Sequence, residues 1–329
     1  MTQDAWADDV PGGAARPCAH GPIRATFLQP LDKLRGRPAG QWLADFNEMR
    51  ELGIKEVCLQ WMQLDGISFA DLPGAGLDAN TFLGPVSEAA STAGMKLRFG
   101  LAADLRLVDV FQSDAAILAE HLAGMRAASI PLAEAILKAA RASGIFSGWY
   151  LPEEIDDASL ADASRRAVWL AHLKAMSDSL PPHGGSVQAS LYITGGLGPQ
   201  DAGQFCASAW ADAGVAVLLQ DGFGARNLAD PQQISGYMAA IDAAVRAVDG
   251  QWGIVIELFE QLAGSPINDQ PFRSATAPMD RVERQIDLAN RFPAAIRTSY
   301  AVSENMLASA GRKARSLAKA YKSLYCGAG

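Results

Sequence analysis

Eight short apolar runs recur along the chain, separated by longer segments in which apolar residues repeat with helical periodicity. Each run is five to seven residues long and mainly apolar on both faces, which is typical of strands that are buried between two layers. The predicted strands are residues 24–29, 56–61, 96–101, 146–151, 187–193, 215–220, 253–258 and 295–299.

The segments between these runs predict helices, several of which end in a glycine just before the next strand. Glycine supplies the left-handed residue that turns a helix back toward a sheet, and the positions are Gly53, Gly94, Gly144 and Gly214. Strand, crossover helix and parallel strand, repeated eight times, predict a single (β/α)8 TIM barrel, which suits a chain of 329 residues. An open doubly wound sheet is disfavoured because LQPLDKLRG, and not G-x-G-x-x-G, follows the first strand.

The chain is expected to form one catalytic domain. Residues 1–21 are interpreted as a flexible N-terminal leader and residues 22–329 as the barrel. The leader lacks the basic start and the apolar stretch of an intact signal peptide. No apolar run reaches the ~18 residues that a membrane span needs, so none is predicted.

The four cysteines have no C-x-x-C spacing, which argues against a zinc site. Cys18 precedes the first strand and Cys326 ends the last helix, so both are expected at the N-terminal rim of a closed barrel. A disulfide between them is geometrically possible, and two unrelated thiols are the alternative. Such a bridge favours an oxidising compartment, and a periplasmic or secreted location is therefore expected.

The formal net charge is −8, and no run or stripe of Lys and Arg occurs. This pattern argues against nucleic acid and anionic membranes as partners. Hydrophobic residues make up 49% of the chain, enough for a sizeable core. We expect a monomer that acts on a polysaccharide or oligosaccharide.

In TIM barrels the active site forms at the C-terminal ends of the strands. None of the four histidines and no lysine falls at such an end here, which disfavours metal-dependent amidohydrolases and Schiff-base enzymes. No metal and no cofactor are therefore expected. Carboxylates, amides and aromatic side chains remain.

That remaining set suits a sugar. Cleavage of a glycosidic bond needs one carboxylic acid that protonates the leaving oxygen and one carboxylate that attacks or stabilises the sugar. Strands 4 and 7 lie on opposite sides of the barrel mouth, so Glu153 or Glu154 can face Glu257 across it. The residues expected to bind substrate are Gln29, Gln60, Trp61, Asp104, Tyr150, Tyr192, Asp221, Phe259 and Tyr300, with Gln220, Trp149 and Phe223 as further candidates.

The segments ATFLQP, LGIKEVCLQW, GWYLPEEIDD and WGIVIELFE resemble a bacterial TIM-barrel family known as domain of unknown function 4434, whose members are regarded as glycoside hydrolases. The acidic residues after strands 4 and 7 also resemble clan A of the retaining glycosidases. That resemblance implies Glu154, or its neighbour Glu153, as the acid/base and Glu257 as the nucleophile. Clan A has Asn directly before the strand-4 glutamate, whereas this chain has Pro152 and Glu153 before Glu154.

Several alternatives stay open. Asp104 and Asp221 fit a turn or pairing role as well as a substrate contact, and Asp156 and Asp157 favour helix capping. The predicted function is a retaining glycoside hydrolase. The alternative is a non-catalytic carbohydrate-binding barrel of an exopolysaccharide or cell-surface system, and a lyase or isomerase using the same carboxylates is a third possibility.

Overall fold

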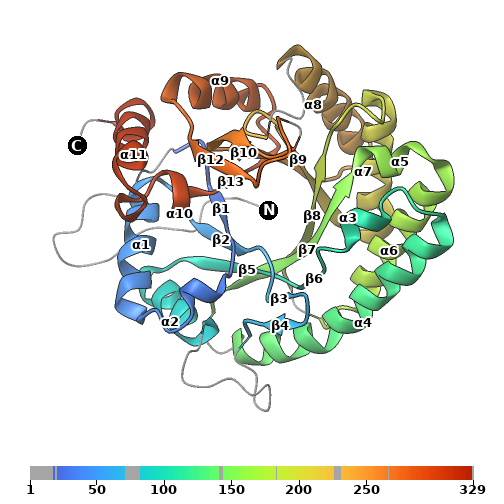
Figure 1. Cartoon of the computed structure of the whole chain (residues 1–329), viewed down its shortest axis with the longest axis horizontal. Coiled ribbons are helices and arrows are strands. Elements are labelled where there is room, and N and C mark those ends of the chain that lie inside the picture. The colour runs from blue at the N-terminus through green and yellow to red at the C-terminus, as the bar shows by residue number, and fades with distance from the viewer. Residues whose placement is uncertain are drawn as a thin grey trace.

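A computed structural model describes residues 18, 21–70, 82–140, 144–182, 184–225, 231–265 and 267–327. Most of the predicted leader, residues 1–21, lies outside these described residues. The described part of the chain contains a closed barrel in which every neighbouring pair of strands is parallel (Figure 1). The predicted (β/α)8 TIM barrel is therefore confirmed.

Each of the eight predicted strands overlaps one strand of the barrel. Around the barrel, β1 lies between β2 and β13, and β10 lies between β13 and β9. The strands are β1 (Ala25–Leu28), β2 (Glu56–Leu59), β5 (Lys96–Gly100), β7 (Phe146–Asp156), β8 (Ser186–Tyr192), β9 (Val215–Gln220), β10 (Trp252–Glu257) and β13 (Ile296–Tyr300).

Strand β7 extends five residues beyond its predicted end, and it contains an irregularity that was not foreseen. Leu151 pairs with Ala189 and Ile155 pairs with Leu191, so three residues of β7 stand opposite the single residue Ser190 of β8. Bulges of this kind bend a strand and re-aim its side chains, often beside active sites. The bulged residues include both Glu153 and Glu154.

A ring of helices covers the barrel, as Figure 1 shows. Gly94 and Gly214 end their helices with φ angles of 65° and 63°, which confirms their predicted capping role. The main helices are α1 (Ala39–Glu51), α2 (Leu83–Ala93), α4 (Ala115–Ala140), α6 (Ala163–Ser179), α7 (Pro199–Ala213), α8 (Pro231–Arg246), α9 (Met279–Asn290) and α11 (Arg312–Tyr325). Shorter ones are α3 (Leu107–Val110), α5 (Asp157–Ala161) and α10 (Val302–Asn305), with 3-10 turns η1 (Asp32–Leu34) and η3 (Ala308–Ala310).

Two small sheets add to the strand loops. One contains β3 (Gln63–Leu64), β4 (Ile67–Ser68) and β6 (Ala102–Ala103), and the other pairs β11 (Phe259–Ala263) with β12 (Arg273–Thr276). The sequence pattern predicted neither sheet, because strands of two to five residues give almost no periodic signal. Both sheets follow the C-terminal ends of barrel strands and so lie where the predicted site lies.

The core has two parts. A small cluster made of Phe27, Cys58, Tyr150, Leu218 and Val255 packs on itself, and its members come from five different barrel strands. A much larger cluster fills the space between the strands and the surrounding helices. The barrel interior is thus filled with side chains, as in other barrels of this class.

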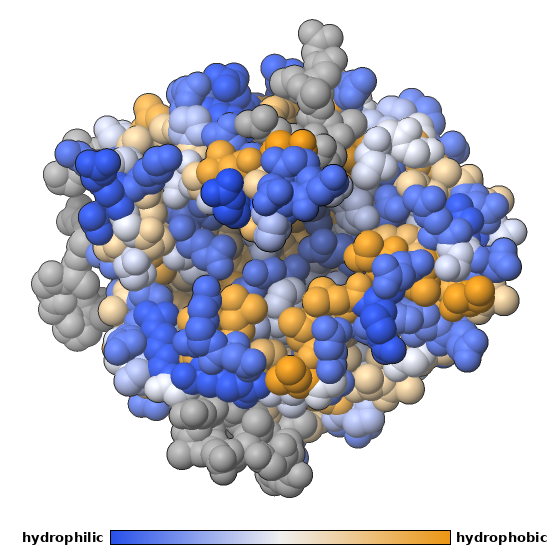
Figure 2. Space-filling model, viewed as in Figure 1, coloured by the Kyte–Doolittle hydropathy of each residue, from blue (hydrophilic) through white to orange (hydrophobic). Residues whose placement is uncertain are grey.

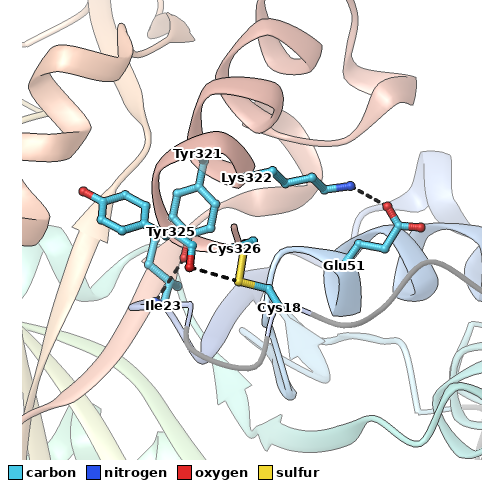
Figure 3. The surroundings of a disulfide bond; sticks show 7 residues. All are labelled: Cys18, Ile23, Glu51, Tyr321, Lys322, Tyr325 and Cys326. Atoms are coloured by element: carbon cyan, nitrogen blue, oxygen red, sulfur yellow. Dashed lines mark hydrogen bonds and ion pairs between the residues drawn. A yellow bond between two sulfur atoms is a disulfide. The ribbon is translucent and has the colours of Figure 1, made fainter. Parts of the chain in front are cut away.

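A disulfide joins Cys18 to Cys326, with their Cα atoms 4.8 Å apart (Figure 3). Of the two alternatives that the sequence left open, the structure has the bridge. Around it, the hydroxyl of Tyr321 accepts a hydrogen bond from the backbone N–H of Ile23 at 3.3 Å. The bridge therefore fastens the chain before β1 to the end of α11. Among the residues that the structure describes, no helix has the length and apolarity to cross a membrane.

Candidate functional site

A cavity of about 400 Å³ opens at the C-terminal ends of the barrel strands, and Figure 2 shows the mouth as a hollow near the centre of this face. It brings together residues from nearly every strand of the barrel. The predicted site residues that line it are Gln29, Gln60, Trp61, Asp104, Tyr150, Glu154, Tyr192, Glu257, Phe259 and Tyr300.

Glu154 reaches the cavity from the bulge in β7. The side-chain N–H of Gln60 donates a hydrogen bond of 3.0 Å to its Oε1 atom, and Gln220 provides a second hydrogen bond. Burial, followed by the negative charge of Glu257, raises the pKa of Glu154 to about 7, and the two glutamine hydrogen bonds oppose this rise. Glu154 therefore can hold a proton near neutral pH.

Glu257 is the last residue of β10, and its carboxylate is fixed by backbone amides. Its Oε2 atom accepts hydrogen bonds from the N–H groups of Gly224 at 2.5 Å and Ala225 at 2.8 Å. Burial raises the pKa of Glu257 above its ordinary value, and these two amides and the positive charge of Arg281 offset part of that rise. The amides favour the ionised form of this carboxylate, which is the form that a nucleophile needs.

A glycine is required where the chain passes Glu257. A Cβ atom added at Gly224 would lie 2.6 Å from the carbonyl oxygen of Phe259 and 2.8 Å from Oε2 of Glu257. No side chain fits there without displacing the carboxylate or the backbone. The close approach of this loop is what lets its amides reach Glu257.

Glu153 and Asp221 do not line the cavity. Glu153 is 1% exposed, and its Oε1 atom lies 3.1 Å from Nε2 of His172 on α6, so it faces the outer helices. Asp221 is 2% exposed and accepts a hydrogen bond of 2.5 Å from Gln285 on α9. Both residues connect the end of a barrel strand to a helix of the surrounding ring.

Aromatic side chains form much of the cavity wall. Tyr150 meets Phe27 edge to face with ring centroids 4.9 Å apart, and Phe259 lies 5.8 Å from Tyr300 and 6.0 Å from Phe272. Burial, then the charges of Glu154, Glu304 and Glu257, keep the pKa of Tyr300 well above its ordinary value, so its hydroxyl stays a donor.

Some lining residues were missed and some candidates lie elsewhere. Phe272 is 61% exposed in the loop between β11 and β12, where no strand end marks it. Gln220 lines the cavity as suggested, whereas Trp149 packs against Phe99 and Phe146 in the outer core. Phe223 is also outside the lining.

The described residues contain no group of three or more His, Cys, Asp or Glu side chains arranged to hold a metal ion. The lining of the cavity contains the carboxylates of Glu154 and Glu257. Their surroundings differ, since amide side chains contact Glu154 and backbone N–H groups contact Glu257.

The model of the family described as Domain of unknown function (DUF4434) matches residues 23–311. The chain belongs to this family. It is also 28% identical over 252 residues to the uncharacterized protein YbcH of Escherichia coli K12, which covers 76% of this chain and 81% of that protein. The resemblance found in the sequence is thereby confirmed.

Solved structures with a similar fold include several glycosidases. A suggested alpha-L-fucosidase of Bacteroides thetaiotaomicron is 17% identical with a TM-score of 0.68, over 96% of this chain and 99% of that one. A GH18 chitinase of Pseudoalteromonas aurantia is 12% identical with a TM-score of 0.51, over 90% and 99% of the two chains. At these identities the similarity shows a shared fold, that of a glycosidase-like TIM barrel.

Proposed function

We propose that this protein is a retaining glycoside hydrolase that acts on an oligosaccharide or polysaccharide. Glu154 is the acid/base and Glu257 is the nucleophile. The proposal agrees with the glycosidase-like fold, although the fold alone does not determine activity. It depends on the properties of the two carboxylates.

The observation that carries the proposal is the different electrostatic setting of two carboxyl groups on one cavity. Burial, followed by the charge of Glu257, raises the pKa of Glu154 to about 7, whereas at Glu257 two backbone amides and Arg281 oppose the rise in pKa that burial causes. With amide hydrogen bonds that favour the anion at Glu257 and a raised pKa at Glu154, the pair suits an anion and a proton donor on one cavity. A protein that only binds sugar has no need of such a pair.

In the first step, the carboxylate of Glu257 attacks the anomeric carbon and Glu154 transfers its proton to the departing glycosidic oxygen. This forms a glycosyl ester on Glu257 and releases the leaving group as an alcohol. In the second step, Glu154, now ionised, takes a proton from water, and the resulting oxygen nucleophile breaks the ester. The sugar leaves with its original anomeric configuration, and both glutamates return to their starting states.

The remaining cavity residues supply binding groups for a sugar. Gln29, Gln60 and Gln220 offer amides to hydroxyl groups, and Gln60 retains a buried Oε1 atom without a hydrogen-bond partner in the described structure. Trp61 and Tyr192 add apolar faces that suit the C–H side of a pyranose ring. The tyrosine hydroxyl of Tyr300 is available as a donor near both carboxylates.

The test is a screen of the purified protein against aryl glycosides and polysaccharides, followed by proton NMR of the first-formed product. Release of a sugar with retained configuration, lost in Glu154→Gln and Glu257→Gln variants that remain folded, is the expected result. Inversion of configuration would overturn the retaining mechanism. Sugar binding without any turnover in the unmodified protein would instead favour the non-catalytic alternative.

The disulfide between Cys18 and Cys326 supports a periplasmic or secreted location, because such bonds persist in oxidising compartments. Labelling of free thiols in protein taken directly from cells tests this. Two reactive thiols at these positions in native material would contradict it.

A further inference from the structure

A second cavity, of about 740 Å³, lies beside the catalytic one. The two share part of their walls, since Ala103, Asp104 and Met125 line both. The second cavity extends between the small sheet of β3, β4 and β6 and the first half of α4. A ligand that fills both cavities is therefore longer than one that fills the first alone.

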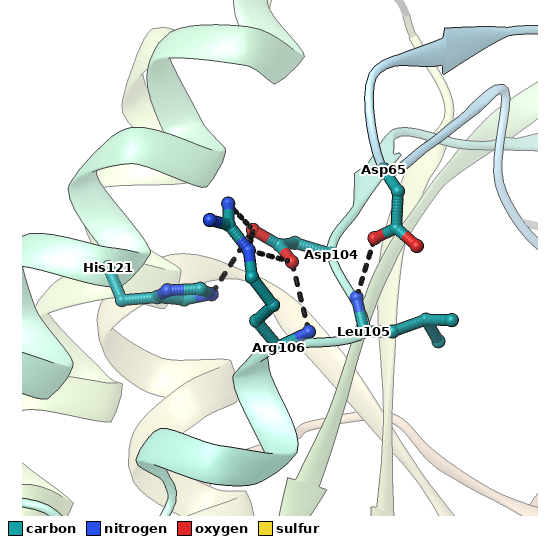
Figure 4. A network of polar contacts seen from close by, with 5 residues as sticks. All are labelled: Asp65, Asp104, Leu105, Arg106 and His121. Carbon is teal, nitrogen blue, oxygen red and sulfur yellow. Dashed lines mark hydrogen bonds and ion pairs between the residues drawn. The ribbon is translucent and has the colours of Figure 1, made fainter.

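Several polar side chains stand on the walls of the second cavity (Figure 4). The carboxylate of Asp104 forms an ion pair with the guanidinium of Arg106, with an N–O distance of 2.6 Å. Its Oδ2 atom also lies 3.8 Å from Nε2 of His121. Beside them, Asp65 accepts a hydrogen bond of 2.9 Å from the backbone N–H of Leu105. These contacts orient the carboxylates of Asp104 and Asp65 on the cavity wall, and the side chain of Arg106 is 81% exposed.

The charges in this cavity indicate the class of ligand. Arg106 lowers the pKa of Asp104, so the two remain an ion pair whose charges cancel. The other carboxylates on the wall are Asp65 and Glu120, and no lysine lines it. The cavity therefore lacks the excess positive charge that a phosphate or a uronic acid requires. Its mixture of acceptors and donors suits neutral hydroxyl groups.

Gly124, on the wall of the second cavity, leaves space there for a ligand. It lies within the 26-residue helix α4, where glycine is less favourable than alanine by about 1 kcal/mol. A Cβ atom added at Gly124 would meet nothing within 4 Å, so close packing does not explain the glycine. Gly124 lines the second cavity, and a larger side chain there would extend into the space that a ligand needs.

We propose that the second cavity is a subsite for the neighbouring sugar units of a neutral oligosaccharide whose scissile bond lies at Glu154 and Glu257. The bound chain passes over Asp104, the polar residue common to both cavities. The proposal rests on the proposed hydrolase function for the identity of its ligand. It adds that the substrate is a neutral chain of at least two units rather than a single glycoside.

The experiment measures binding by calorimetry to a Glu257→Gln background, which prevents turnover. The probes are gluco-, galacto-, manno- and fuco-configured neutral oligosaccharides of one to six units. With the configuration that binds, the Kd for a trisaccharide is expected to be at least about tenfold lower than that for the monosaccharide. Adding Gly124→Leu should abolish this gain and leave the monosaccharide Kd within about twofold.

A matched control is Gly236→Leu, since Gly236 is an exposed glycine of α8 whose added Cβ also meets nothing within 4 Å. It should keep the full dependence on chain length. The subsite is overturned if Kd still depends on chain length in Gly124→Leu, or if it does not depend on chain length in the protein that keeps Gly124. Failure of every probe to bind also overturns it.

Parallel assays of sugar release by protein with Glu257 intact separate the two proposals. Length-dependent binding without hydrolysis contradicts the hydrolase and retains the subsite. Hydrolysis without length dependence does the reverse.

Discussion

Gln60, just beyond β2, donates a hydrogen bond of 3.0 Å to Oε1 of Glu154 in the bulge of β7. The bond joins two residues that are 94 positions apart, and it stabilises the charged form of the carboxyl group. Burial and the charge of Glu257 act in the opposite direction and prevail, with a resulting pKa of about 7. The protonation state of Glu154 is thus a balance that single substitutions can move.

The first prediction concerns the pH dependence of hydrolysis. A general acid works only while protonated, so activity should fall as the pH rises through about 7. Gln60→Met removes a hydrogen bond that lowers the pKa of Glu154, and the alkaline limb of kcat/KM should move up by about half a unit to one unit. Gln204→Met, on the exposed side of α7, serves as control and should leave the limb in place. If the alkaline limb does not move in Gln60→Met, the ionisation of Glu154 is not the cause of that limb.

The second prediction concerns the stability cost of Glu154. Because its pKa is raised in the folded state, folding stability should decline as the pH rises from about 4.5 to about 7 and stay reduced above that range. Glu154→Gln removes this cost. The variant should exceed the unmodified protein in stability by about 3 kcal/mol at pH 8 and match it at pH 4.5, while its activity falls about 10²–10⁴-fold.

Urea unfolding at both pH values measures the difference. Glu134→Gln, at an exposed position on α4, is the matched control and should change stability little at either pH. If Glu154→Gln were less stable than the unmodified protein at pH 8, the carboxylate would be favourably solvated rather than strained by burial.

The eight barrel strands could be predicted because each is covered on both faces, which leaves a continuous apolar run in the sequence. The end of β7 could not, since Pro152, Glu153 and Glu154 interrupt that run and are typical of a loop. Their strand character comes from the bulge opposite Ser190, which depends on tertiary pairing.

The candidate site was predictable to the extent that strand ends meet at one rim. Position along the chain could not distinguish Glu153 from Glu154, because the partner of Glu153 is His172 on a helix that follows. The partner of Asp221 is Gln285, 64 residues away, which no local pattern reveals. Phe272 was missed for a related reason, since it belongs to a loop and not to a strand end.

The third prediction concerns the loop that holds Glu257. Gly224→Ala places a Cβ atom against Oε2 of Glu257 and the carbonyl oxygen of Phe259, so the carboxylate must shift. Displacement of a reacting group by about 1 Å can cost about 10²-fold in rate, and kcat should fall by that order. Gly236→Ala, on open helix surface, should leave kcat unchanged. Equal kcat in the two variants would show that this contact does not position the nucleophile.

The fourth prediction separates the two adjacent glutamates. Glu153→Gln keeps an oxygen acceptor for the ring of His172 and should retain most of the activity, in contrast to Glu154→Gln. Glu153→Ala leaves a buried ring nitrogen unpaired and should lower the free energy of unfolding by about 1–3 kcal/mol. Chemical denaturation and initial rates measure the two effects. A large loss of kcat in a well-folded Glu153→Gln protein would give this residue a part in proton transfer.

The fifth prediction concerns the bridge between Cys18 and Cys326, which are 308 positions apart in the chain. A crosslink over so long a segment restricts the unfolded state, and its loss typically costs about 2–4 kcal/mol. For a chain of this length that corresponds to a fall in Tm of about 3–6 °C. Thermal unfolding with and without dithiothreitol measures it.

The Cys18→Ser/Cys326→Ser variant should already show the lower Tm and should not respond to the reductant. The other two cysteines, Cys58 and Cys206, are buried and unpaired, so they provide no second bridge to reduce. Since the disulfide lies at the rim opposite the cavity, kcat at 25 °C should stay the same in the variant. A double variant that still loses stability in dithiothreitol would mean that the reductant acts elsewhere in the molecule, and the stabilisation would then not belong to this bridge.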